Sequence, residues 1–252
     1  FGRVLSTYAE RVKAFQPNAR YYLISAILTG AALGVFRLLF NFYVLSQGYD
    51  EALLGTLITT NSLTALLAAL PMGYLVDIIG RKIALILGGL AITAAIFGMV
   101  LLPSTAMFVA MSVLIGLGNA LTGVTMGPFL MENSSEKERT YLFSFAAGLQ
   151  MAAGSVGNWV GGYLPTWMAA LNGTTPTSPQ SYAWSLGVIA AAGAAGVLPL
   201  LLMRMPKLER GERSLFAPLS YFKDPSALLG RLILPMLIIS VGAGLVMPFM
   251  NV

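Results

Sequence analysis

The chain has 252 residues, of which 57% are hydrophobic and only 10% are charged. Ordinary soluble domains carry about 25% charged residues, and several apolar runs here reach the ~20 residues that cross a lipid bilayer. The sequence therefore predicts an all-α membrane protein that crosses the bilayer several times. It contains neither cysteine nor histidine, which excludes disulfides, thiolate catalysis and the commonest metal ligand. We expect no enzyme activity, no cofactor, no metal site and no nucleic-acid partner.

The first nineteen residues carry an apolar stripe at helical spacing, with cations elsewhere around the helix. The stripe consists of Phe1, Leu5, Tyr8, Val12 and Phe15. We expect residues 1–19 to form an amphipathic helix on the membrane surface, with a disordered tail as the alternative. Because the chain starts with Phe1 and not with Met, we also expect its start to have been trimmed.

Seven apolar runs follow, separated by short polar or charged segments. The predicted spans cover residues 21–45, 52–75, 83–102, 106–131, 141–164, 182–203 and 232–252. Residues 132–140 are predicted to be a charged loop, and residues 165–181 a polar segment on the opposite face. The first six spans form a predicted N-domain over residues 20–203, followed by a connector over residues 204–231. We expect the seventh span to be the start of a second domain that continues beyond this sequence.

The positions of the cations predict the orientation in the membrane. Every Lys and Arg except Arg37 precedes the first span or follows the second, fourth or sixth span. The segments after the first, third and fifth spans carry none. The positive-inside rule therefore places the N-terminus, the basic loops and the connector in the cytoplasm. We expect a multi-pass protein of the cell membrane, specifically a bacterial inner membrane, with the lipid bilayer as its surroundings.

The segment between the second and third spans carries a recognisable pattern. Its characteristic residues are Gly73, Leu75, Asp77, Gly80, Arg81, Lys82 and Leu85. Asp77 and Arg81 are four residues apart and can form an ion pair, and Glu132 at the end of the fourth span is placed to join it. In residue types, spacing and topological position this segment resembles the signature loop of the major facilitator superfamily of transporters. The family usually has a basic residue where this chain has Ile78.

The resemblance implies a role for this loop and an architecture for the chain. It implies that Asp77, Arg81 and Glu132 latch the two halves of a transporter together on the cytoplasmic side, with Gly73, Gly80 and Lys82 completing the motif. The alternative is that Arg81 and Lys82 only anchor the topology. The resemblance covers the six-helix N-terminal bundle, the connector and the start of the second bundle, which is about half of a twelve-helix transporter.

The function implied by the resemblance is secondary active transport of a small solute by alternating access. The membrane-embedded parts of the first six spans contain no Asp, Glu or His, so a coupling ion, where one is used, is expected to bind mainly in the second half. Two alternatives stay open. Aromatic residues on the first span favour efflux of lipophilic or drug-like compounds or lipids, and a non-transporting membrane sensor could use the same fold.

The first span carries the most informative polar residue. Gly30, Gly34, Arg37 and Asn41 are spaced by four, three and four residues and share one stripe. An arginine inside the membrane costs roughly 2.5 to 3.5 kcal/mol, and no acid lies within the first six spans to neutralise it. We expect Arg37 to bind an anionic or zwitterionic substrate, or to pair with an acid in the second half. The other candidate substrate-binding residues, each of which could instead be an interhelical hydrogen-bonding group, are Asn41, Asn61, Asn119 and Gln150.

Small residues predict close helix packing. On the fifth span, Ala147, Gly154, Gly157 and Gly161 share a face with Gln150, and the fourth span repeats the pattern with Gly116, Ala120, Gly123 and Gly127. The run of glycines around Asn158 also looks like the glycine-rich motif of antiporters in the superfamily, with Asn158 in place of proline.

Overall fold

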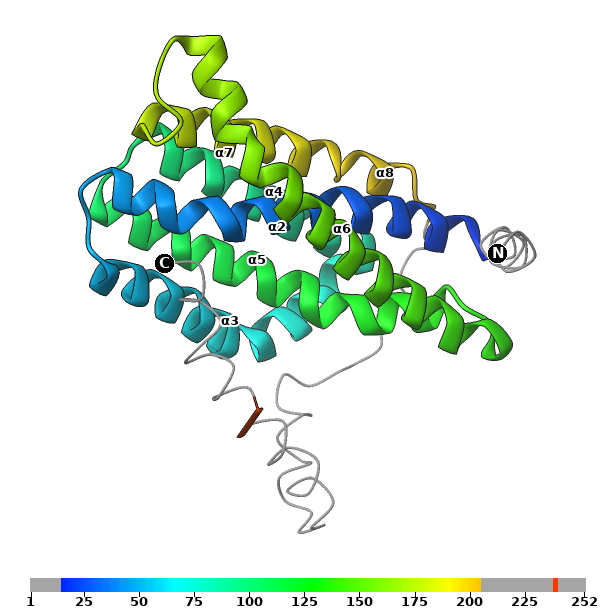
Figure 1. The fold of residues 1–252 in the computed structure, drawn as a ribbon. Helices are drawn as coiled ribbons and strands as arrows, with labels where there is room; N and C mark the ends of the chain where they lie inside the picture. Colours follow the sequence, from blue (N-terminus) through cyan, green and yellow to red (C-terminus); the bar gives the residue numbers. More distant parts are fainter. Residues whose placement is uncertain (1–14, 205–237, 240–252) are drawn as a thin grey trace, which may run out of the picture. The chain divides into compact units, whose positions relative to one another are not determined.

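The computed structural model describes residues 15–204 together with Ile238 and Ile239, and all regular structure in these residues is helical (Figure 1). The predicted all-α class is confirmed. Residues 1–207 form one compact unit, and residues 208–252 belong to another. The predicted surface helix up to residue 14, most of the connector and nearly all of the seventh span lie outside the described residues.

The helices follow one another through short connections. They are α2 (Pro17–Ser46), α3 (Glu51–Ile79), α4 (Arg81–Leu101), α5 (Thr105–Glu132), α6 (Glu136–Asn172), α7 (Pro179–Ala195) and the single turn α8 (Leu198–Leu201). Three starts are capped by side chains, each of which accepts a hydrogen bond from a backbone N–H. Asp50 accepts from Leu53, Ser104 from Met107 and Ser178 from Ser181.

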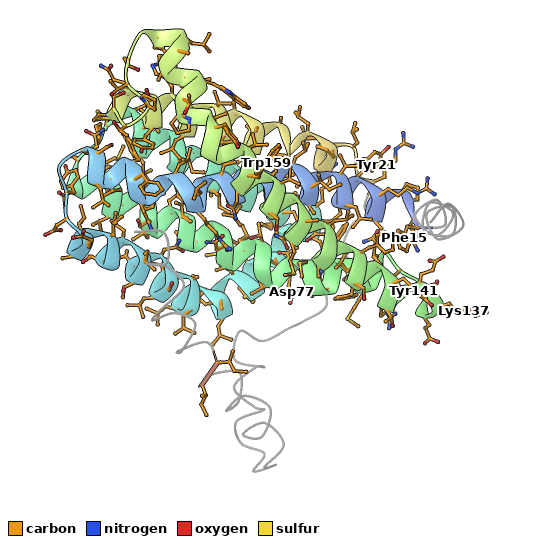
Figure 2. All side chains as sticks on the ribbon, in the orientation of Figure 1. Phe15, Tyr21, Asp77, Lys137, Tyr141 and Trp159 are labelled. Atoms are coloured by element: carbon orange, nitrogen blue, oxygen red, sulfur yellow. The ribbon has the colours of Figure 1, made fainter. Side chains whose placement is uncertain are left out.

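By length and composition, five helical segments of the described residues can cross a bilayer. They are α2, α3, α4, α5 and the combined segment Pro179–Leu201. Helix α6 is the longest but is less apolar, because it begins with charged residues and contains several glycines together with Gln150 and Asn158. Its outer face nevertheless exposes large apolar side chains, among them Trp159, which is marked in Figure 2. This face is suited to contact with lipid.

The structure differs from the predicted spans at both ends of α6. The predicted loop 132–140 is much shorter, because α6 already begins at Glu136, with acidic Glu136 and Glu138 in its first turn where they favour the helix dipole. At the other end α6 continues through Pro165 to Asn172. The next residue, Gly173, caps the helix with a φ of 66°, which suits glycine. The predicted sixth span is also interrupted. Pro199 has no N–H to donate to Ala195, where α7 ends.

The helices pack as two groups of three. Helix α2 lies against α6 and α7, α5 lies against α3 and α4, and the groups meet mainly along α4 and α7. Helices α2 and α5 make few direct contacts with each other. The largest buried cluster fills the end of the bundle near the α2–α3 connection, where Tyr43 and Phe108 meet edge to face at 6.1 Å.

Glycines allow the backbones of α2 and α6 to touch. A Cβ on Gly34 would overlap the backbone of Gly154, and a Cβ on Gly157 would overlap the carbonyl of Ala31. A Cβ on Gly161 would lie 2.8 Å from a methyl carbon of Val35. The packing prediction for the fifth span is therefore confirmed at these glycines.

The packing prediction for the fourth span is only partly right. A Cβ on Gly116 would lie 2.6 Å from the carbonyl oxygen of Asn61, so this glycine does allow α5 to approach α3. A Cβ on Gly123 or Gly127, however, would meet no neighbouring atom within 4 Å. Among the described residues, these two glycines face open space and bring no helix into close contact.

We expect Gly157→Ala to lower the stability of the protein markedly. The added methyl group meets the α2 backbone, which cannot move aside as a side chain can, and overpacking of this kind costs about 1–3 kcal/mol. Gly162→Ala on the same helix is the matched control, because its Cβ would meet nothing within 4 Å. Thermal unfolding of the purified full-length protein measures both. Equal unfolding temperatures for the two variants would contradict the backbone contact.

Candidate functional site

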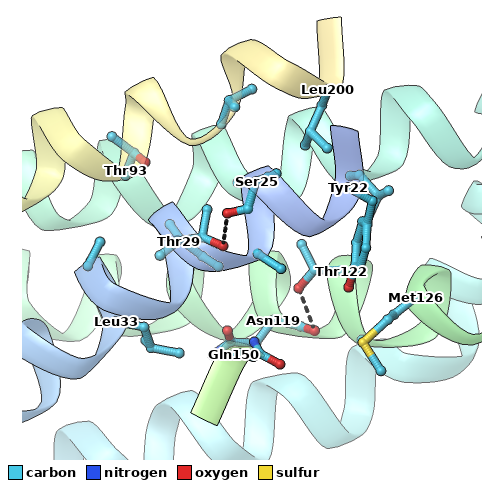
Figure 3. Close-up of a pocket in the computed structure, with 18 of the residues that line it drawn as sticks. Tyr22, Ser25, Thr29, Leu33, Thr93, Asn119, Thr122, Met126, Gln150 and Leu200 are labelled. Carbon is cyan, nitrogen blue, oxygen red and sulfur yellow. Dashed lines mark hydrogen bonds between the residues drawn. The ribbon is translucent and has the colours of Figure 1, made fainter. Parts of the chain in front are cut away.

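A cavity of about 330 Å³ lies inside the bundle, between α2 and α5 (Figure 3). Its volume falls within the roughly 300–1,000 Å³ of small-molecule pockets. Most of the wall is apolar, and none of the described residues that form it is a Lys, Arg, Asp or Glu. The polar residues of the wall are Tyr22, Ser25, Thr29, Thr93, Asn119, Thr122 and Gln150. The cavity therefore suits an uncharged, largely apolar molecule or part of a molecule.

Two of the five predicted substrate-binding residues, Asn119 on α5 and Gln150 on α6, line the cavity together (Figure 3). The Nδ2 of Asn119 donates a hydrogen bond to the Oδ1 of Asn61 over 3.3 Å. Asn61 itself is not part of the wall. Through this bond it joins α3 to α5 and constrains the Asn119 amide.

Only some of the polar groups in the wall are available to a ligand. The hydroxyl of Thr29 donates to the carbonyl of Ser25, and that of Thr122 donates to the carbonyl of Gly118, so both bond within their own helices. Among the described residues, neither the hydroxyl of Tyr22 nor the amide of Gln150 has a hydrogen-bond partner. The Tyr22 ring extends toward Thr122 and Met126 (Figure 3). Sequence reasoning missed Tyr22, which no motif distinguishes.

Arg37 and Asn41 do not line the cavity. Arg37 is exposed and lies one helical turn beyond Leu33, which does belong to the wall. Within the described residues, no acid forms an ion pair with Arg37. Asn41 lies a further turn along α2 and is buried, with 5% of its surface exposed. The structure thus places the charged candidate beside the cavity and the uncharged candidates Asn119 and Gln150 in its wall.

Arg81 bridges two acids at one end of the bundle, here called the charged end and formed by residues 15–20, 77–82, 129–139 and 200–204. Its Nη1 lies 3.1 Å from Oδ1 of Asp77, and its Nη2 lies 2.9 Å from Oε1 of Glu132. The arginine side chain is 11% exposed, whereas those of Asp77 and Glu132 are 36% and 46% exposed. The ion pairs expected from the sequence are therefore present and join the α3–α4 junction to the end of α5.

Two glycines of the same loop differ in what they do. Gly80 joins α3 to α4 with a φ of 89°, a conformation that glycine adopts readily and other residues avoid. Its N–H donates to the carbonyl of Val76 over 2.9 Å. A Cβ on Gly73 would meet no atom of the described residues within 4 Å, and nothing in them explains this glycine.

Lys82 makes a connection that sequence reasoning missed. Its Nζ donates to the carbonyl oxygens of Leu201 and Met203, over 2.7 Å and 2.8 Å. A cation at the end of a helix satisfies carbonyls that have no partner within the helix and interacts favourably with the helix dipole. Lys82 therefore ties the start of α4 to the end of α8.

Asn18 forms a second connection at the charged end. Its Nδ2 donates to Oδ1 of Asn133 and to the carbonyl of Arg204, each over 3.0 Å, and its Oδ1 accepts from the N–H of Arg204. One side chain thus joins the start of α2, the end of α5 and the chain that follows α8. No sequence signal marks it, because the partners are more than a hundred residues apart.

Three features together define a multi-pass membrane protein of the transporter class. They are the helices suited to crossing a bilayer, the cavity of ligand size within the bundle, and the arginine that bridges two acids in the loop between the second and third spans. The family model described as Major Facilitator Superfamily matches residues 22–252, so the chain belongs to that superfamily. Members of this superfamily are transporters rather than enzymes. No curated protein matches the chain.

We expect Lys82→Met to destabilise the protein, because the substitution keeps the length of the side chain but leaves two helix-end carbonyls without their charged donor. Hydrogen bonds to charged groups contribute about 1.5–3 kcal/mol, and partial exposure reduces this to about 1 kcal/mol here. Lys137→Met is the control, since Lys137 is exposed and forms no hydrogen bond or ion pair among the described residues. Thermal unfolding compares the two. If Lys82→Met lowers the unfolding temperature no more than the control does, the two carbonyls are satisfied without Lys82.

Proposed function

We propose that this protein moves a small anionic or zwitterionic solute across the cell membrane by alternating access, with Arg37 as the residue that binds the negative charge. The observation that carries the proposal is the exposed guanidinium of Arg37 on a membrane-crossing helix that lacks an acidic partner among the described residues. The orientation with the N-terminus in the cytoplasm is part of the proposal and rests on the distribution of cations.

The position of Arg37 argues against a role as a simple membrane anchor. Ser46, the last residue of α2, is nine positions further on, so Arg37 lies about 14 Å from that end of the helix at 1.5 Å per residue. A cation at that depth is retained where it meets water, a partner or a ligand. The planar guanidinium suits carboxylate or phosphate, to which it can donate two parallel hydrogen bonds.

The uncharged candidates complete the proposed binding region. Asn119 and Gln150 offer amide groups in the cavity wall beyond Leu33, and Asn61 holds Asn119 in place. Asn41 is buried on α2 one turn past Arg37 and supports the same stretch of helix. The described cavity wall offers no acid or histidine, so a coupling ion, if the cycle uses one, binds elsewhere in the full protein.

We assign the latch on the cytoplasmic side to Asp77, Arg81 and Glu132, with Gly73, Gly80 and Lys82 in the same motif. The ion pairs of Arg81 lie between partly exposed groups, whose individual pairs contribute little to stability. Such bonds can open and close during a cycle at low cost. Their location at the junction between α3 and α4 suits a gate better than a permanent support.

Efflux of lipophilic compounds or lipids is the second candidate function. The uncharged and mainly apolar wall of the cavity favours it. A sensor on the same fold would bind ligand without moving it, so flux measurements on full-length protein in liposomes separate it from both transport functions.

We expect Arg37→Ala to reduce uptake of an organic anion into liposomes containing the full-length protein by at least about tenfold, since charged hydrogen bonds contribute about 1.5–3 kcal/mol. Arg37→Lys should retain part of the uptake, because it keeps the charge but loses the paired donors. Lys137→Ala, which removes an exposed cation outside the cavity, should transport normally. Undiminished uptake by Arg37→Ala would refute the assignment of Arg37 to the substrate.

We expect Glu132→Gln to open the cytoplasmic side more often, because it weakens one of the two bridges of Arg81. The opening is measured with Gly123→Cys in a protein that has no other cysteine. Gly123 is suitable because it lines the cavity and has open space at its Cβ position among the described residues. A membrane-impermeant maleimide applied from the cytoplasmic side should label it faster in Glu132→Gln. Glu136→Gln is the control, because Glu136 forms no ion pair among the described residues. Equal labelling rates in Glu132→Gln and Glu136→Gln would refute the role of Glu132 in the latch.

A further inference from the structure

We propose that the solute is an amphipathic organic anion, whose charged head binds Arg37 and whose apolar body occupies the cavity between α2 and α5. This inference rests on the proposed function and names the substrate class for the same site. Two observations support it, and each alone points to a different ligand. Arg37 has no acidic partner among the described residues, which favours an anion, whereas the described wall of the cavity carries no charge, which favours an apolar molecule.

The chemistry of the cavity selects the body of the ligand. Aliphatic side chains such as Leu33, Ile92 and Ile96 make up much of the wall, so an apolar chain or ring gains free energy on leaving water. A charged group would lose its hydration there without finding a partner. The amide of Gln150 and the hydroxyl of Tyr22 can serve one polar substituent on that body.

The geometry of α2 connects the head to the body. Leu33 lines the cavity, and Arg37 follows on the same side of the helix one turn later, about 6 Å along the axis. Long side chains in helices lean toward the N-terminal end of their helix, which for Arg37 is the side of Leu33 and the cavity. A molecule with a carboxylate or phosphate at one end and an apolar body can therefore reach both.

Within the described residues, the cavity opens onto the surface of the bundle. Gln150 and Gly123 both line it and are both exposed. No described residue packs against Gly123, so the described helices leave the cavity open at this point. A small inorganic anion would leave this space unused, and a lipophilic cation would bring its charge beside Arg37.

The test measures the binding of unbranched monocarboxylates from butanoate to decanoate to the full-length protein in nanodiscs. Each acid competes with radiolabelled octanoate, and protein-free nanodiscs correct for partition into lipid. We expect affinity to rise about threefold to fourfold for each methylene group and to level off once the chain fills the cavity. Equal affinity for butanoate and decanoate would overturn the inference.

Two glycine variants locate the apolar body. Gly123→Leu places a side chain in the cavity and should lower octanoate affinity more than tenfold while changing butanoate affinity less than twofold. Unchanged butanoate binding also shows that the variant is folded, and Gly123→Ala should give an intermediate loss. Gly127→Leu is the matched control on the same helix, since its Cβ position is equally open but it does not line the cavity. Equal losses in the two leucine variants would overturn the inference.

Arg37→Ala separates failure of this inference from failure of the proposed function. If Arg37→Ala binds none of the acids, but affinity in the unmodified protein does not depend on chain length, the anion site at Arg37 is supported and the amphipathic substrate is refuted. If Arg37→Ala binds all the acids as well as the unmodified protein does, the assignment of the anion site to Arg37 is refuted. Octanol tests the head group directly: we expect it to compete at least tenfold more weakly than octanoate, and equal competition would show that the cavity takes neutral molecules without using Arg37.

Discussion

The close contact between the backbones of α2 and α6 is the constraint on which the arrangement of the bundle depends. Inside a bilayer, apolar helices gain little from leaving lipid for one another, so close packing of small residues has to hold them. Gly34 and Gly157 bring α2 against α6, while Gly116 brings α5 against α3. Each of the two central helices is thus drawn toward its own group of three. The space between them is left for the cavity.

Both ends of the bundle contain buried apolar clusters, and the charged end, whose cluster includes Phe129 and Leu130, also has polar links between its helices. Near the α2–α3 connection, buried aromatic and aliphatic side chains such as Tyr43 and Phe108 interlock, and such contacts change only when the packing changes. At the charged end, the links of Arg81 and Lys82 are ion pairs and hydrogen bonds, several of them partly exposed. Polar links of this kind can exchange partners with water at small cost. The end with the exchangeable links is also the end with the loop that resembles the signature loop of the superfamily.

The sequence predicted those features that depend on local spacing or on a single helix. The pair Asp77 and Arg81 follows from a separation of four residues, and the exposed position of Arg37 agrees with an arginine that has no acid nearby. Features that depend on how distant helices meet were not predictable. The bond between Asn18 and Asn133, the open space beside Gly123 and the cavity itself result from the distance between α2 and α5. The continuation of α6 through Pro165 was missed because proline usually ends helices in water but is tolerated in membrane helices.

Helix α2 connects the cavity to the charged end. It carries Arg37 and Leu33 beside the cavity, and at its start it carries Asn18, whose amide bonds to Asn133 at the end of α5, next to Glu132. Helices α2 and α5 therefore bound the cavity and also carry the Asn18–Asn133 hydrogen bond. A change in their separation alters the volume available to a ligand and the length of that bond at the same time. Because the glycine contacts pack the backbone of α2 directly on α6, and Gln150 of α6 lines the cavity, these two helices together form one side of that space.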